Sequence, residues 1–195
     1  MKEIDLEIKK KSLTLIIGPS GSGKSTLLNL ASLMDTPTRG KILIRGKDTS
    51  KMSKSERIRI RRNQIGIIYQ RDSLLPYLTI LENVMVPMVA KDQKKAVKIL
   101  KIVGLSHISK FPDEISRADQ QRVALSRAVI NNPSLLLADE PTGELNSEDT
   151  EKIINLIKDV GNKCAVLIAS NNPDLGKYCD NILSLKDGIL MGNPN

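Results

Sequence analysis

Short apolar runs alternate with amphipathic stretches along this chain of 195 residues. The apolar runs have the length of β-strands, whereas the stretches between them repeat their apolar positions at the spacing of an α-helix. The pattern predicts strands over 13–18, 40–46, 64–70, 134–140, 163–170 and 181–188, and helices over 24–34, 92–103, 121–130 and 147–161. Strands that alternate with helices indicate an α/β fold with a mostly parallel sheet.

One part of the chain interrupts this alternation. Residues from about 73 to 130 contain no clear strand, although helical spacing recurs within them. We therefore expect a single domain over 1–195, with a core formed by about 1–72 and 131–195. A helical subdomain of about 73–130 would be inserted into that core.

Composition narrows the class of protein. The chain is 40% hydrophobic, which suits one globular domain, and its two cysteines are too few for a disulfide framework. No apolar run approaches the ~20 residues that span a bilayer, and the N-terminal sequence MKEIDLEIKKK lacks the apolar stretch of a secretory signal. These features indicate a soluble, cytosolic domain.

The chain is strongly basic, with a formal net charge of +8. Many of the cations lie in 47–62, KDTSKMSKSERIRIRR. The plainest interpretation of such a run is a solvated helical face. A functional alternative places it against anionic lipid headgroups beside a membrane partner. Nucleic acid is disfavoured as a partner, because no aromatic residues interleave the charges and aromatics make up only 2% of the chain.

A phosphate-binding motif lies between the first predicted strand and helix. GPSGSGKS (18–25) satisfies G-x-x-x-x-G-K-[ST] in the strand–loop–helix context that its mechanism requires. Glycines allow backbone amides to curl around a phosphate, and the helix N-terminus adds positive potential. Lys24 would reach the β- and γ-phosphates of a nucleotide, and Ser25 would bind Mg²⁺. The expected nucleotide contacts come from Gly18, Pro19, Ser20, Gly21, Ser22, Gly23, Lys24, Ser25 and Thr26.

An acidic pair follows a second apolar strand. LLLADEP (135–141) ends its strand in Asp139 and continues with Glu140. Asp139 can hold Mg²⁺ directly or through water, and Glu140 can polarise an attacking water as a general base. Together with the phosphate loop, this pair predicts that the chain binds a nucleoside triphosphate with Mg²⁺.

Several further motifs occur in an order that resembles the ATP-binding-cassette (ABC) ATPases over essentially the whole chain. Gln70 ends IGIIYQ as the Q-loop glutamine does, and LLPYLTILENV (74–84) is similar to a segment of the lipoprotein-releasing, macrolide-export and cell-division group. The remaining matches are QQRVALSRAV after the signature position, ADEPTGELNS in the Walker B and D-loop region, and YCDNILSLKDG near the end.

This resemblance implies a P-loop NTPase (RecA-like) core and a mechanism. Two such domains, in a homodimer or a heterodimer, would associate head to tail and hold each ATP between one chain's phosphate loop and the other's signature. Closure and reopening would drive a transmembrane permease subunit on the cytoplasmic face of the membrane. Gln70 would link Mg²⁺ and the attacking water to the helical subdomain, and Ser116 and Asn171 would contact nucleotide.

The signature itself departs from the family pattern. Ile115, Ser116, Arg117, Ala118 and Asp119 stand where the family has Leu-Ser-Gly-Gly-Gln. Side chains at the paired glycine positions would obstruct the approach of backbone amides to a phosphate, and an aspartate would repel it. Ser116 to Asp119 also fits the capping box [ST]-x-x-[DE], so the helix start would be satisfied by its own chain. Alternatively, Ser116 and Arg117 still hold the phosphate, with Arg117 supplying charge.

Other positions depart as well. Asn171 stands at the switch histidine, while the chain's only histidine, His107, is expected on the surface. Asn146 replaces the usual D-loop aspartate, and Glu144 a small residue. The family's N-terminal strand and adenine-stacking aromatic are not matched, which predicts a truncated N-terminal β subdomain.

Two function classes follow. The first is the ATPase subunit of a membrane transporter or related membrane machine, with Lys24, Ser25, Gln70, Asp139 and Glu140 as its working residues. The second is a regulatory subunit that binds nucleotide but hydrolyses it weakly or not at all, and that could form half of a heterodimer.

Overall fold

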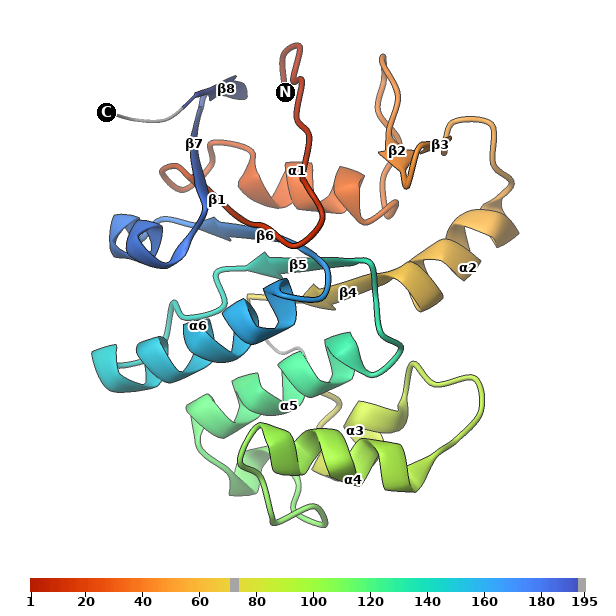
Figure 1. The fold of residues 1–195 in the computed structure, drawn as a ribbon, viewed down its shortest axis with the longest axis vertical. Coiled ribbons are helices and arrows are strands. Elements are labelled where there is room, and N and C mark those ends of the chain that lie inside the picture. Colours follow the sequence, from red (N-terminus) through yellow and green to blue (C-terminus); the bar gives the residue numbers. More distant parts are fainter. Residues whose placement is uncertain (71–73, 193–195) are drawn as a thin grey trace.

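A computed structural model describes residues 1–70 and 74–192 of the chain. Its centre is a six-stranded sheet with the spatial order β4-β5-β6-β1-β7-β8, and β2 and β3 form a separate hairpin (Figure 1). The strands are β1 (Leu13–Ile17), β2 (Leu43–Ile44), β3 (Lys47–Asp48), β4 (Ile65–Ile68), β5 (Leu135–Asp139), β6 (Ala165–Ser170), β7 (Asn181–Lys186) and β8 (Ile189–Met191). The predicted α/β fold with a mostly parallel sheet is confirmed.

Parallel pairing brings the carboxyl ends of five strands to one edge of the sheet. Within the six-stranded sheet, β1, β4, β5, β6 and β7 pair in parallel, and β8 alone pairs antiparallel, with its neighbour β7. β8 follows a tight turn in which Asp187 and Gly188 both adopt positive φ. The turn is too short for a crossover connection, so the chain can only fold back antiparallel.

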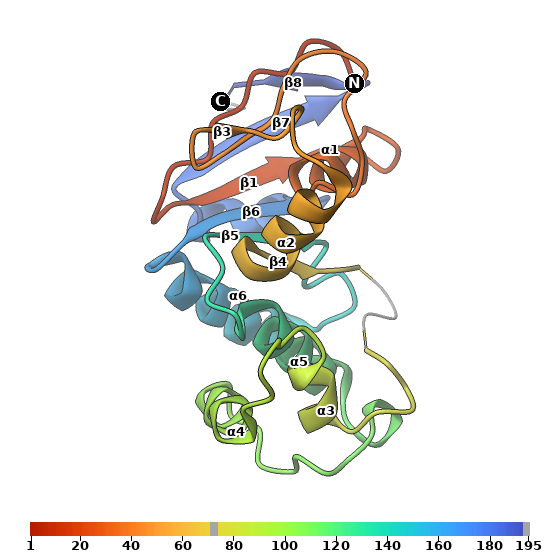
Figure 2. The same ribbon diagram turned by 90° about the vertical axis from the view of Figure 1, so that its right-hand side faces the viewer.

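The helices divide between the sheet and the insertion. The α-helices are α1 (Lys24–Ala31), α2 (Lys54–Gln64), α3 (Ile80–Met85), α4 (Gln93–Ile102), α5 (Arg117–Val129) and α6 (Ser147–Gly161), and the 3-10 helices are η1 (Pro112–Glu114) and η2 (Pro173–Tyr178). α3, α4 and α5 lie together below the sheet, as Figures 1 and 2 show. Between β4 and β5 the described residues, 74–134, contain no strand. The predicted start of the insertion, about residue 73, lies outside the described residues.

Alternate residues of the strands belong to two hydrophobic cores on opposite faces of the sheet. Leu15 is fully buried in the core formed with α5, α6 and the helices of the insertion, whereas its neighbour Ile16 belongs to the core that contains residues of α1. Successive side chains of a strand point to opposite faces, which explains this division. A sheet covered on both faces has strands that are almost continuously apolar, and the runs LTLII and AVLIAS contain one polar residue each, Thr14 and Ser170.

Several elements differ from those predicted, and the largest differences have identifiable causes. The strand expected over 40–46 is only β2, because the chain reverses at Arg45 and Gly46, both with positive φ, into the hairpin with β3. α5 begins at Arg117 instead of 121, because Ser116 caps it. α2 and α3, which periodicity did not resolve, both begin at a complete capping box, Ser53 with Glu56 and Thr79 with Glu82.

Gly66 is required where β4 packs under α5. A Cβ atom added at Gly66 would lie 2.4 Å from the carbonyl oxygen of Ala128, and backbone cannot move aside as a side chain can. We expect Gly66→Ala to lower the free energy of unfolding by more than about 2 kcal/mol, measured by urea denaturation. The matched control is Gly161→Ala at the end of α6, where a Cβ meets Val166 at an ordinary 3.6 Å. A decrease of the same size in both variants would contradict this explanation.

Candidate functional site

Most of the predicted site residues follow the carboxyl ends of four neighbouring strands. Gly18 follows β1 and Gln70 lies two residues beyond β4. Asp139 ends β5, Glu140 follows it, and Asn171 follows β6. Because these strands are adjacent and parallel, the topology brings the residues to one edge of the sheet. The edge combines loop amides, a lysine and two carboxylates.

The loop between β1 and α1 has the shape expected of a phosphate cradle. Gly21 and Gly23 adopt φ values of 80° and 105°, a left-handed conformation that other residues rarely adopt. At Gly18 a Cβ atom would lie 2.2 Å from the carbonyl oxygen of Leu185 on β7, so only glycine fits. The hydroxyl of Ser22 is buried and has no hydrogen-bond partner among the described residues. A buried polar atom without a partner suits a loop that receives a polar ligand.

Lys24 is held inside this loop. Lys24 is 8% exposed, and its Nζ donates hydrogen bonds to the carbonyl oxygens of Gly18 (2.7 Å) and Pro19 (3.1 Å). The same Nζ lies 3.8 Å from Oε1 of Glu140. Ser25 and Thr26, in the first turn of α1, are exposed. The ammonium group is therefore positioned at the centre of the loop, beside the acidic pair.

Glu140 is fixed by two residues of the neighbouring strand β6. Its Oε2 accepts a hydrogen bond of 2.8 Å from Oγ of Ser170, and its backbone N–H donates to the carbonyl oxygen of Ala169. The side chain is almost fully buried, and the backbone has a φ of 46°, which is uncommon for a residue with a Cβ. Strained backbone of this kind is concentrated at functional sites. The carboxylate faces Lys24 across the loop.

Ser170 is a site residue that sequence reasoning missed. It ends β6 immediately before Asn171, and its Oγ both donates to Glu140 and accepts from the backbone N–H of Asn172. The available signal was its position: a serine at the carboxyl end of a buried strand in a parallel sheet points toward the ligand edge.

Oxygen ligands for Mg²⁺ are present on both sides of the loop. Ser25 offers a hydroxyl at the start of α1, and Asp139 a half-buried carboxylate at the end of β5. Hydroxyl and carboxylate oxygens are the hard ligands that Mg²⁺ prefers, usually completed by water and phosphate. In the described chain no three His, Cys, Asp or Glu side chains gather into a metal cluster of their own. The donor set fits a metal held jointly with a nucleotide.

Ser116 caps α5 as predicted, but the carboxylate of Asp119 does not have the predicted partner. The Oγ of Ser116 accepts a hydrogen bond from the backbone N–H of Asp119, which is half of the expected capping box. The carboxylate of Asp119 should have folded back onto the helix start, and this prediction is wrong: it accepts from Nη1 of Arg122 at 2.7 Å. A charged donor one turn along the helix competes successfully with a neutral backbone amide.

The substituted signature places only one bulky side chain on the surface. Ala118 is buried, with 6% of the residue exposed, so its methyl group does not obstruct the helix start. Arg117 is exposed and lies along its own chain, where its Nη1 donates to Gln120 (3.1 Å) and its Nε lies 3.8 Å from Glu144. Gln121 donates to the carbonyl oxygen of Pro141 (3.0 Å), so α5 is also tied to the segment after Glu140.

The two asparagine positions have different roles. Asn146 is the N-cap of α6, where its Oδ1 accepts from the backbone N–H of Asp149 (2.8 Å). Asn171 is exposed at the sheet edge, and its side chain forms no hydrogen bond within the described chain. An amide can donate a hydrogen bond to a phosphate oxygen but cannot carry a proton. Neither asparagine blocks the phosphate loop.

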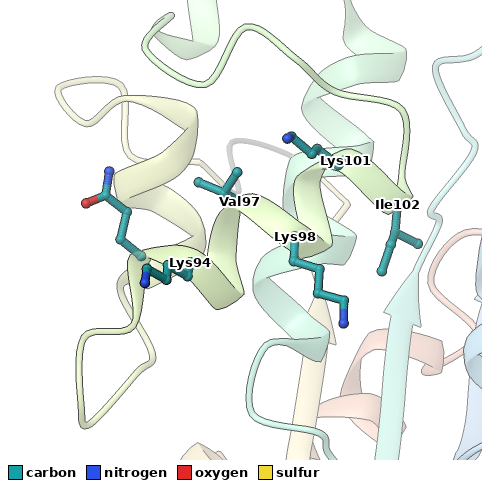
Figure 3. Close-up of a pocket in the computed structure, with 6 residues that line it drawn as sticks. Lys94, Val97, Lys98, Lys101 and Ile102 are labelled. Carbon is teal, nitrogen blue, oxygen red and sulfur yellow. The ribbon is translucent and has the colours of Figure 1, made fainter.

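An open hollow of about 620 Å³ lies elsewhere, on the outer face of α4 (Figure 3). Its walls include Lys94, Val97, Lys98, Lys101 and Ile102, and Figure 3 shows these side chains projecting outward from one helix. The hollow contains no carboxylate and none of the predicted site residues. This hollow is therefore not the candidate functional site, despite its size.

Comparison with known proteins identifies the family. The family model described as ABC transporter matches residues 1–143. An uncharacterised ABC transporter ATP-binding protein of Methanocaldococcus jannaschii is 40% identical over 199 residues, covering 98% of this chain and 89% of that protein. The lipoprotein-releasing system ATP-binding protein LolD of a Shewanella species is 40% identical over 200 residues, covering 98% and 87%.

A solved structure leads to the same family. The dimeric ATP-binding cassette MJ0796, in a post-hydrolysis state with ADP and Pi, superposes with a TM-score of 0.89 at 35% identity and covers all of this chain and 91% of that one. None of the described helices of this chain is long and apolar enough to cross a membrane. The chain therefore belongs to the ABC transporter family of ATPases, as an ATP-binding subunit.

Proposed function

We propose that this chain hydrolyses Mg-ATP at the edge formed by β1, β4, β5 and β6, and that hydrolysis drives a transmembrane permease. The observation that carries the proposal is the buried network that joins Lys24, Glu140 and Ser170 beside the phosphate loop. This network places a cation for phosphate oxygens next to a carboxylate that can accept a proton from water.

Each residue of the edge has a part in that reaction. The ammonium group of Lys24, which now donates to loop carbonyls, would donate to the β- and γ-phosphates. Ser25, Asp139 and Gln70 would hold Mg²⁺, which supplies charge neutralisation on the phosphates when bound. Glu140 would orient and deprotonate the attacking water, and Ser170 would keep its carboxylate in place. Asn171 would donate a hydrogen bond to the γ-phosphate.

We further propose that two copies associate head to tail, each ATP lying between one copy's phosphate loop and the other's α5. Support comes from the similar cassette MJ0796, whose solved structure is dimeric. Ser116 and Arg117 stand at the start of α5, where amide groups and a guanidinium are available to an anion. Residues 73–130 would act as the helical subdomain that transmits closure to the permease, at the cytoplasmic face of the membrane.

ATP-driven association tests this arrangement. Sedimentation velocity of the purified chain is expected to show monomers without nucleotide and dimers with ATP and Mg²⁺, because the nucleotide completes both interfaces. Ser116→Asp places a carboxylate at the expected phosphate contact and should suppress the dimer by charge repulsion. Aspartate is also an effective N-cap, so the helix start is retained. Dimers that form equally well in this variant would contradict a head-to-tail interface through α5.

One observation favours a second candidate. The guanidinium of Arg117 contacts Gln120 and Glu144 of its own chain, so the signature surface is partly satisfied internally. A subunit of this kind could bind ATP and depend on a different subunit's signature for hydrolysis. Pull-down of a second ABC ATPase with glycines at the signature would support that heterodimer.

A further inference from the structure

The net charge of the molecule is concentrated in one segment. Residues 39–62 contain ten Lys or Arg and two Asp or Glu, a net charge of +8, which equals the formal charge of the whole chain. The charges of the other residues therefore balance. The segment forms the β2–β3 hairpin and α2, which lie side by side on the right of Figure 1 and face the viewer in Figure 2.

Neither acid of the segment offsets its neighbouring cations through an ion pair. Asp48 accepts hydrogen bonds from the backbone N–H and the hydroxyl of Ser50, and Glu56 accepts the same pair of bonds from Ser53 in its capping box. These hydrogen bonds lower the pKa of both carboxyl groups, Asp48 through Ser50 and Glu56 through Ser53. Both carboxylates are thus engaged in local turns, and every cation of the segment except the half-buried Arg57 and Arg61 is exposed to solvent.

α2 is attached to the protein mainly by arginines, and Ile60 is its one apolar side chain packed against the core. No residue of α2 is buried. Arg57 donates to Thr36, Arg61 to the carbonyl oxygen of Leu33, and Arg62 to the carbonyl oxygens of Pro87 and Met88. These guanidinium groups, together with the half-buried Ile60, anchor the helix to the segment after α1, to the segment after α3 and to the core.

The outer side combines cations with exposed apolar side chains. Lys54 and Ile58, four residues apart, and the adjacent Arg59 are all exposed, Ile58 at 45%. Leu43 on the neighbouring hairpin is 51% exposed, and Val89, next to the anchor of Arg62, is 71% exposed. No hydrogen bond or ion pair ties Lys54 or Arg59 to the rest of the described chain.

We infer that this surface, formed by α2 and the β2–β3 hairpin, docks on anionic lipid headgroups. Basic side chains are attracted to a negatively charged leaflet, and apolar side chains between them can enter the interfacial region. Duplex nucleic acid would satisfy the cations but would leave Ile58 and Leu43 without an apolar environment. The surface lies at the end of α1 opposite the phosphate loop, so this inference does not depend on the proposed function.

Vesicle binding by the purified full chain tests the inference. We expect the chain to co-sediment with vesicles of phosphatidylcholine and phosphatidylglycerol but not with phosphatidylcholine alone, and to be released by high salt. Lys54→Glu with Arg59→Glu should weaken binding roughly tenfold or more, since each cation near the surface contributes about 1 kcal/mol. Lys24→Ala should bind vesicles as the wild type does, which separates this result from nucleotide binding.

The matched control is Lys94→Glu with Lys98→Glu, the same change of charge on α4. It should weaken binding several-fold less than the α2 variant does. An equal decrease in both variants, or no binding to the anionic vesicles, would overturn the inference.

Displacement of the chain from vesicles by a DNA duplex, with the same dependence on Lys54 and Arg59, would instead identify a nucleic-acid surface. Ile58→Ser, which changes no charge, should also weaken binding, and its failure to do so counts against a lipid surface.

Discussion

Replacement of Glu140 by glutamine is expected to reduce Mg-ATP turnover roughly 10²–10⁴-fold, the usual contribution of a general base. Glutamine retains the size of the side chain and an oxygen that can accept from Ser170, so the fold should be unchanged. It cannot take a proton from water. ATP binding should persist, and the bound ATP should remain uncleaved. Turnover is measured by phosphate release, and bound nucleotide by filter retention.

Glu148→Gln is the control for this change. Glu148 is an exposed residue in the first turn of α6, and it pairs with Lys152 at 2.6 Å on the surface. Exposed ion pairs contribute little to stability, so neither turnover nor stability should change measurably. Equal turnover in Glu140→Gln and the wild type would exclude Glu140 as the base.

Lys24→Ala is expected to remove both ATP binding and turnover. The variant lacks the ammonium group that lies at the centre of the phosphate loop, and it leaves the buried Glu140 carboxylate without its cation. Charge-assisted hydrogen bonds contribute about 1.5–3 kcal/mol each, so affinity should fall roughly 10- to 100-fold for each hydrogen bond from Lys24 to a phosphate oxygen. Isothermal titration with ATP and Mg²⁺ measures the affinity.

The comparison for Lys24 is Lys152→Ala, which removes a lysine of α6 that is 48% exposed. ATP affinity should be the same as in the wild type. If Lys24→Ala retained wild-type affinity while remaining folded, the phosphate loop would not be the nucleotide site.

Local motifs made the nucleotide edge predictable from the sequence. The loop 18–25 and the pair Asp139–Glu140 follow strands that are apolar throughout, and parallel pairing then forces them together. Ser170 was missed because a single serine after an apolar run has no motif of its own. Its role arises only where β6 lies between β5 and β1.

The start of α5 shows where sequence reasoning reaches its limit. The pattern Ser116 to Asp119 correctly located the cap. It predicted a backbone amide as the partner of the Asp119 carboxylate, whereas the guanidinium of Arg122 is its partner. Complete capping boxes at Ser53 and Thr79 carry glutamate at the third helical position, where the longer side chain reaches back to the backbone. Burial of Ala118 could not be predicted, because it depends on how α5 packs against the rest of the chain.

α2 was difficult to predict from the sequence, because its attachment also depends on contacts with distant segments. Its residues show no apolar periodicity, since arginines hold it to carbonyl oxygens and a threonine hydroxyl of distant segments. Periodicity detects helices that bury an apolar face, and α2 places only the half-buried Ile60 against the core. The capping box of Ser53 and Glu56 marks its start, but the prediction of elements from the sequence did not use that signal.

Turnover of Mg-ATP by the purified chain, measured at increasing protein concentration with Lys24→Ala as the blank, tests the central claim most directly. We expect turnover above the blank, with a specific activity that rises with concentration as dimers form. ATP that is bound but not hydrolysed at any concentration would contradict a self-sufficient ATPase. The chain would then be a nucleotide-binding subunit that requires another subunit's signature.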